Sequence, residues 1–210
     1  DKRRLHMSRK SYYVLSSLVC LMPILLGVLH YSALPENMPI HWDVSGSPDN
    51  FAAKPFVVYG IPAAMTVFNI ILNALTDCRR GCPASMRAIL GWVLPVMTII
   101  LYTTTIYYAL GFGIKIEVVV PVIVGILLVA IGNYLPKVKA NPSFGILTLR
   151  SRCSSENRRK INRFGGFAFV AGGLLMILFA LLHLPYIALA ALLLSAISPL
   201  VYSLILKQRA

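Results

Sequence analysis

The stretch FGGFAFVAGGLLMILFALLHLPYIALAALLLSAISPLVYSLIL, residues 164–206, contains no Asp, Glu, Lys or Arg. A helix needs about 20 apolar residues to cross the hydrocarbon core of a bilayer, so this run is long enough for two crossings. The segment HLPY, residues 183–186, divides the run, because Pro185 removes a backbone donor and restricts the residue before it. Lipid offers the backbone no hydrogen-bond partner, so each crossing is expected to be helical. The sequence therefore predicts helices near 165–183 and 186–206.

Four further charge-free runs precede this stretch, and they predict helices near 12–31, 56–76, 88–110 and 118–135. The strands of a membrane β-barrel would be about ten residues long with alternating polarity, and these runs are longer and evenly apolar. Charged residues make up 13% of the 210 residues, against roughly 25% in soluble proteins. The fold class expected is all-α: a polytopic membrane protein with about six transmembrane helices in a single membrane domain, 1–210.

The positive charges indicate the orientation of these helices. With the N-terminus in the cytoplasm, eighteen of the twenty Lys and Arg residues fall on the cytoplasmic side, and only Lys54 and Lys115 fall outside. This is the positive-inside bias of membrane proteins, and it predicts that both termini are cytoplasmic. Loop 32–55 is then extracytoplasmic and loop 136–164 cytoplasmic. A net charge of +13 distributed in this way favours contact with anionic lipid head groups, not nucleic acid.

The extracytoplasmic loop contains a dense polar stretch, PIHWDVSGSPDNFAAKP, residues 39–55. Its prolines restrict the backbone and SPDN is a turn signal, so an ordered loop is expected. Its carboxylates would attract a cationic peptide or a metal ion. The candidate ligand-binding residues are His41, Trp42, Asp43, Gly46, Asp49 and Lys54. Structural roles are the alternative: hydrogen bonding or capping within the loop for His41, acceptance of backbone N–H groups for Asp49, and for Lys54 an ion pair with Asp49 or contact with a phosphate.

Three asparagines lie within the predicted spans. Asn69 and Asn73 are one turn apart on one face of the second helix, and Asn133 is near the cytoplasmic end of the fourth. Such groups either join helices by hydrogen bonds or line a path for a substrate. The spans contain no Asp, Glu, Lys or Arg, which argues against a pump or a proton-coupled carrier.

The cytoplasmic loop carries eight Lys or Arg residues and one acidic residue, Glu156. From Ser154 to Phe164 it predicts a short basic helix lying along the membrane, with Ser154 or Ser155 as its cap. Lipid phosphates or an acidic cytoplasmic protein would be its partner. The candidate contact residues are Asn141, Arg150, Arg158, Arg159, Lys160 and Arg163.

The loops 32–55 and 136–164 both open with Leu-Pro, one after the first helix and one after the fourth. Three helices followed by three, with matching loops on opposite faces, is the arrangement of an inverted repeat. No Gly-x-Ser-x-Gly and no His-Glu-x-x-His occurs, so an enzyme would have to rely on loop residues, chiefly His41 and Asp49. We expect no metal site and no cofactor.

Three segments resemble the SdpI immunity-protein family. LPENMPIHWDVSGSPDNFAAKPFVVYGIP, residues 34–62, is similar to the extracytoplasmic signature of that family. GNYLPKVKANPSFGI, residues 132–146, resembles its segment after the fourth helix, and SSENRRKINRFGG, residues 154–166, resembles its approach to the fifth. The inner loop departs from the family pattern: Leu147, Leu149 and Arg150 replace Arg, Pro and Trp. Arg158 stands in place of Trp and Asn162 in place of His.

The resemblance implies a bacterial cell-membrane protein that gives resistance to a secreted peptide toxin. It also implies signalling through a cytoplasmic regulator held at the membrane, a role that the altered inner loop puts in question. Two alternatives stay open: a transporter of a lipid or small apolar molecule, and an envelope enzyme that uses His41 and Asp49.

Overall fold

The computed structural model describes residues 9–78, 84–137, 145–146, 148 and 154–206. Six helical spans within them are long and apolar enough to cross a membrane, which confirms the prediction of an all-α polytopic membrane protein. The spans are Ser11–Leu29, Phe56–Asp77, Leu90–Ala109, Ile116–Lys137, Ser155–Leu181 and Pro185–Ile205. Many of their large apolar side chains are exposed, as is expected of side chains that face lipid.

The residues form two compact units, which divide between the third and the fourth span. One unit comprises residues 1–42 and 48–114, and the other comprises residues 43–47 and 115–210. Three spans fall in each unit, as the expected arrangement of three helices followed by three requires. The inverted repeat itself stays a prediction.

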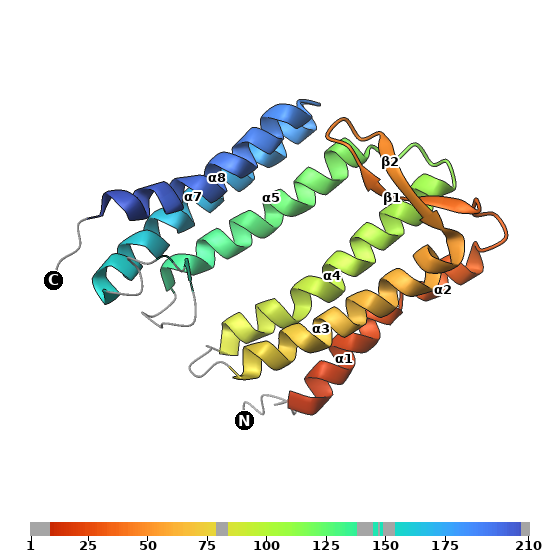
Figure 1. The fold of residues 1–210 in the computed structure, drawn as a ribbon, viewed down its shortest axis with the longest axis horizontal. Helices are drawn as coiled ribbons and strands as arrows, with labels where there is room; N and C mark the ends of the chain where they lie inside the picture. Colours follow the sequence, from red (N-terminus) through yellow and green to blue (C-terminus); the bar gives the residue numbers. More distant parts are fainter. Residues whose placement is uncertain (1–8, 79–83, 138–144, 147, 149–153, 207–210) are drawn as a thin grey trace, which may run out of the picture. The chain divides into compact units, whose positions relative to one another are not determined.

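In the first unit, α1 (Arg9–Leu21), α3 (Ile61–Cys78) and α4 (Ala84–Ala109) pack side by side (Figure 1). The first span is interrupted before α2 (Ile24–Leu29), because Pro23 has no N–H to continue the helix. The short π-helical turn η1 (Phe56–Gly60) leads directly into α3.

The second unit contains α5 (Ile116–Tyr134), the 3-10 turn η2 (Leu135–Lys137), α7 (Ser155–Leu181) and α8 (Pro185–Ile205) (Figure 1). α5 and α7 approach closely at glycines. A Cβ added at Gly132 would lie 2.7 Å from the carbonyl oxygen of Gly166. Small residues of this kind allow membrane helices to pack backbone against backbone.

The first turns of α7 differ from the expected separate helix along the membrane. α7 begins at Ser155 and runs without interruption to Leu181, so residues 155–164 continue directly into the fifth span. Ser154 is its cap, as predicted: the Ser154 side chain accepts a hydrogen bond from the Asn157 N–H at 3.4 Å. An unbroken helix keeps every backbone group bonded where the chain enters the membrane.

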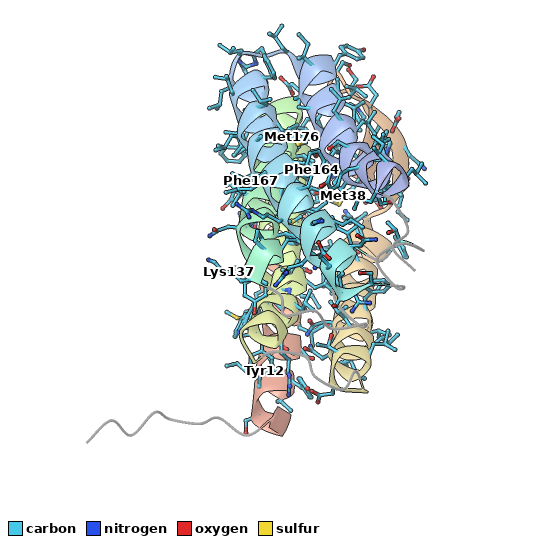
Figure 2. The ribbon with its side chains drawn as sticks, turned by 90° about the vertical axis from the view of Figure 1, so that its left-hand side faces the viewer. Tyr12, Met38, Lys137, Phe164, Phe167 and Met176 are labelled. Carbon is cyan, nitrogen blue, oxygen red and sulfur yellow. The ribbon has the colours of Figure 1, made fainter. Side chains whose placement is uncertain are left out.

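One element was not predicted by the sequence. The loop after the first span contains an antiparallel hairpin of β1 (Asn37–Trp42) and β2 (Pro48–Ala53) (Figure 1). The loop is therefore held in one conformation by strand pairing as well as by its prolines. Figure 2 shows the side chains, among them Met38 of β1 and Phe164 and Phe167 of α7.

Candidate functional site

The hairpin is fixed to the helices at its open end by one buried side chain. Met38 is fully buried, in a cluster with Leu34, Val57, Val58 and, on α4, Tyr102 and Ile106. Full burial of a Met side chain contributes roughly 1.5–3 kcal/mol. Ile40 and His41, the next residues but one along β1, are exposed, so the hairpin also has a surface away from the helices, called here its free side.

Lys54 closes the hairpin at the same end. Its side chain is 8% exposed, and its Nζ donates to the Leu34 carbonyl oxygen at 3.0 Å and lies 2.8 Å from Oε1 of Glu36. The same ammonium lies 4.8 Å from the ring centroid of Tyr31, a cation–π contact. Lys54 therefore forms an ion pair within the protein, as the structural alternative predicted. Its partner is Glu36 and not Asp49.

Asp43 organises the turn between the strands. Its Oδ1 accepts hydrogen bonds from the Ser45 hydroxyl at 2.7 Å and from the Ser47 N–H at 2.9 Å. These bonds, that of Ser45 first, lower the pKa of the Asp43 carboxyl below its ordinary value. Gly46 has a φ of +86°, a conformation that favours glycine. Both residues therefore have a structural role in shaping the turn.

His41 and Asp49 meet on the free side of the hairpin. His41 Nδ1 lies 2.6 Å from Asp49 Oδ1, and the two side chains are 68% and 47% exposed. The strand register shifts between the pairs His41–Asn50 and Trp42–Pro48, so Asp49 has no partner on β1 and this bulge brings its side chain to His41. An imidazole paired with a carboxylate on an exposed surface presents both a hydrogen-bond donor and negative charge to a ligand.

Two exposed apolar side chains, Ile40 and Phe51, belong to the same strands. They were not among the candidate residues, because single apolar residues in a loop carry no motif. Trp42 packs edge-to-face against Tyr108 of α4, with ring centroids 5.7 Å apart. Its ring therefore supports the hairpin on α4.

The polar groups expected on the second span lie between helices. The Asn69 Nδ2 donates to the Ser16 hydroxyl of α1 at 3.0 Å, and the Asn73 Nδ2 donates to the Asn69 carbonyl oxygen at 2.9 Å. Both asparagines are buried. This arrangement favours helix association over a substrate path. Asn133, in contrast, is exposed near the end of α5.

The basic residues of the predicted cytoplasmic contact divide into two groups. Arg159 and Arg163 are exposed, and Lys160 is exposed and pairs with Glu156 at 2.7 Å. Arg158 is buried on the opposite side of the helix. Asn141 and Arg150 lie outside the described residues.

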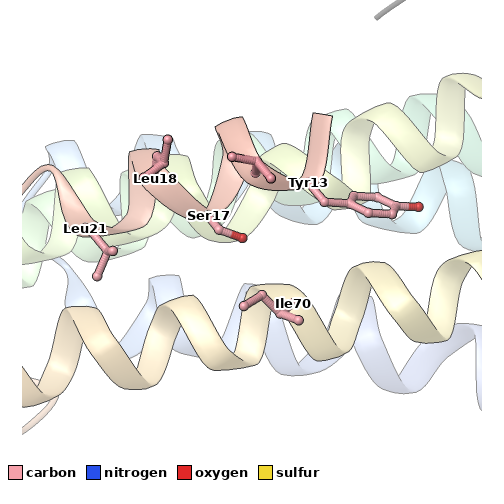
Figure 3. A pocket seen from close by; sticks show the side chains of 6 residues that line it. Tyr13, Ser17, Leu18, Leu21 and Ile70 are labelled. Atoms are coloured by element: carbon pink, nitrogen blue, oxygen red, sulfur yellow. The ribbon is translucent and has the colours of Figure 1, made fainter. Parts of the chain in front are cut away.

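An apolar groove of about 270 Å³ lies between α1 and α3 (Figure 3). It is lined by Tyr13, Val14, Ser17, Leu18, Leu21 and Ile70. Its walls are almost entirely apolar, as is common where two membrane helices face lipid. Among the described residues, no group of three or more His, Cys, Asp or Glu side chains is arranged to hold a metal ion.

Comparison with known proteins gives two matching families and one curated relative. Residues 18–66 match a domain of unknown function, DUF1648, and residues 137–203 match the SdpI/YfhL protein family. The immunity protein SdpI of Bacillus subtilis (strain 168) is 23% identical over 176 residues, which are 84% of this chain and 84% of that protein. No solved structure matches this chain.

Proposed function

Because this chain belongs to the SdpI/YfhL protein family, we propose that it is a membrane immunity protein that protects a bacterial cell from a secreted antimicrobial peptide. The observation that carries this proposal is the exposed His41–Asp49 pair on a hairpin whose other side is anchored in the helices. The hairpin is the proposed site of peptide recognition.

The surface of the hairpin suits a cationic, amphipathic peptide. Asp49 supplies a negative charge, and Ile40 and Phe51 supply exposed apolar area on the same two strands. The buried Met38 and the tied Lys54 hold the strands in place before a ligand arrives. Such preorganisation reduces the entropy that binding would otherwise cost.

Recognition of a secreted peptide requires the hairpin to face away from the cytoplasm. The positive-inside distribution supports this orientation, with both termini cytoplasmic in the bacterial cell membrane. A cysteine placed at Ser45 should react with a membrane-impermeant maleimide in intact cells, whereas one placed at Ser143 should not. The reverse pattern would exclude the proposed orientation.

Protection itself is tested by expression in a peptide-sensitive strain. The chain should raise the concentration of peptide needed to kill, and His41→Ala and Asp49→Asn should each abolish most of the gain. Asn50→Ala is the matched control, because Asn50 is an exposed neighbour on the same strand. Unchanged killing across a panel of secreted cationic peptides would contradict the proposal. An equal loss of protection in all three variants would show that the His41–Asp49 pair has no specific part in recognition.

The transporter alternative has less support. Of the polar groups that would line a path, Asn69 donates to Ser16 of α1, and Asn73 donates to the Asn69 carbonyl oxygen within α3. The enzyme alternative would use His41 and Asp49 as an acid–base pair, and no nucleophile is paired with them among the described residues. A binding role needs only the exposed pair and its surroundings.

On the cytoplasmic side, we propose that the exposed cations of α7 contact anionic lipid. Arg159 and Arg163 lie in the turns just before the apolar part of the helix, where lipid phosphates are close. A regulator held at the membrane by this segment would have to recognise the same cations, and charge-reversal of Arg159 would then change signalling without changing peptide tolerance.

A further inference from the structure

Arg158 is a buried cation near the beginning of α7. It is 6% exposed and shares the buried face of the helix with Ile161, Asn162 and Gly165. A guanidinium keeps its proton under all ordinary conditions, so burial cannot neutralise it. The cost of removing such a charge from water is several kcal/mol unless a counter-charge and hydrogen bonds accompany it.

No such partner is found among the residues that the structure describes. The Arg158 Nε is buried and has no hydrogen-bond acceptor, and no ion pair of Arg158 with a described carboxylate is present. The nearest acid in sequence, Glu156, lies two residues earlier, and two residues correspond to about 200° around a helix. Glu156 therefore points away from Arg158, and it pairs with Lys160.

A second unpartnered donor lies one turn further along the same face. Asn162 is 2% exposed, and its Oδ1 accepts a hydrogen bond from the Ile146 N–H at 2.9 Å, but its Nδ2 has no acceptor. Residues four apart on a helix have Cβ atoms about 5–6 Å apart. Arg158 and Asn162 are thus neighbours on one face of α7, and each has a buried donor without an acceptor.

The position of this pair along α7 corresponds to the depth of lipid head groups. Arg163 is the last charged residue before the apolar part of α7, which begins at Phe164. Asn162 and Arg158 precede Phe164 by two and six residues, or about 3 and 9 Å of helix. The head-group layer on each side of the hydrocarbon is roughly 5–8 Å thick, so the pair extends from within this layer to its outer edge. The beginning of α7 also carries the positive end of the helix dipole, which opposes a cation and favours an anion.

From these observations we infer that Arg158 and Asn162 form a binding site for the phosphate of an anionic phospholipid. The phosphate supplies the counter-charge for Arg158, and an oxygen of the same head group accepts the hydrogen bond from Asn162. The acyl chains follow the apolar surface of α7, where Phe164 and Phe167 are exposed (Figure 2). This site is independent of the peptide proposed to bind at the hairpin, and its failure would leave the protection assay unchanged.

The test is binding of phosphatidylglycerol to the purified full chain in detergent, measured by native mass spectrometry. The chain should bind phosphatidylglycerol in preference to phosphatidylcholine. Arg158→Met keeps an unbranched side chain and removes the charged guanidinium. It should weaken binding roughly ten-fold or more, because hydrogen bonds to charged groups are strong. Lys115→Met, which removes an exposed cation outside α7, should leave binding within about two-fold of the original.

Three outcomes would overturn the inference. One is the absence of a preference for phosphatidylglycerol in the unmodified chain, and another is an equal loss in Arg158→Met and Lys115→Met, which would indicate that binding depends on net charge and not on Arg158. The third is displacement of the lipid by inorganic phosphate in millimolar excess, which would assign the site to a free anion. If Arg158→Met fails to fold, Asn162→Leu retains the cation, removes the second donor and should still weaken binding measurably.

Discussion

The Nδ1 atom of His41 lies 2.6 Å from Oδ1 of Asp49, and this pair joins the two strands of the hairpin on their exposed side. Both side chains remain in contact with solvent, so the interaction is screened and contributes little to stability. The His41–Asp49 pair is therefore a better candidate for ligand recognition than for stabilising the fold.

Because the His41–Asp49 pair is exposed, Asp49→Asn should barely change the stability of the protein. The free energy of unfolding should fall by less than about 1 kcal/mol, the usual range for an exposed ion pair. Thermal unfolding of the purified chain, followed by tryptophan fluorescence, measures the change. A large destabilisation would show that the pair holds the hairpin together, and any loss of peptide protection would then reflect misfolding.

Lys54→Met should be clearly more damaging. The Lys54 ammonium is buried and has three partners, namely the Leu34 carbonyl, the Glu36 carboxylate and the Tyr31 ring. Its removal leaves the Leu34 carbonyl without this bond and should cost about 1–3 kcal/mol. Thermal unfolding under the conditions used for Asp49→Asn gives the comparison.

Glu36→Gln is the matched control for Lys54→Met, because the Glu36 side chain is 84% exposed and the amide can still accept a hydrogen bond. Its effect should stay below about 1 kcal/mol. If Glu36→Gln and Lys54→Met destabilised the protein equally, the ion pair, and not the buried bond to the Leu34 carbonyl, would be the important interaction.

The helical part of this fold could be predicted from the sequence, because a charge-free run of about 20 residues can cross lipid only as a helix that satisfies its own backbone hydrogen bonds. The hairpin could not, because β1 contains Pro39 and β2 begins at Pro48, and both residues weaken a strand pattern. The strands form because Met38 is buried among helices and because Lys54 and Glu36 close the open end. These contacts are tertiary and leave no local signal.

The candidate residues of the loop were identified by type, and their separate roles depend on orientation. His41 and Asp49 are brought together and exposed, whereas Lys54 points inward and Asp43 is used by the turn. Among the basic residues of α7, no sequence pattern distinguishes Arg158 from Arg159. Only the packing of the helix places one inside and the other outside.

The turn at Asp43 should respond to acid. Hydrogen bonds from Ser45 and Ser47 lower the pKa of the Asp43 carboxyl in the folded turn relative to the unfolded chain. The carboxylate therefore stabilises the turn at pH values above its ordinary pKa. This contribution declines as the pH falls below that value and is lost once the pH passes through the lowered pKa of the folded state.

The amide resonance of Ser47, followed by NMR of the protein in nanodiscs, should report this titration, because the Ser47 N–H donates to Asp43. Ser45→Ala removes the larger cause of the shift and should raise the midpoint toward the ordinary value for an aspartate. A midpoint that does not move in Ser45→Ala would show that the Ser45 hydroxyl does not hold the carboxylate.

The contact between α5 and α7 should tolerate no added methyl group. A Cβ at Gly132 would lie 2.7 Å from the Gly166 carbonyl oxygen, and one at Gly173 would lie 2.6 Å from the Gly125 carbonyl oxygen. Both neighbours are backbone atoms, so relief requires the helices to separate. Gly132→Ala and Gly173→Ala should each lower the free energy of unfolding by about 1–3 kcal/mol, the usual cost of overpacking.

Ala130→Leu is the control for this contact, because Ala130 lies on the same helix and is exposed. The larger side chain extends into lipid there and should leave thermal unfolding in detergent nearly unchanged. If Gly132→Ala were as stable as the unmodified chain, α5 and α7 would not approach each other at these glycines. A loss of stability in the two glycine variants but not in Ala130→Leu would identify the backbone contact as the basis of their association.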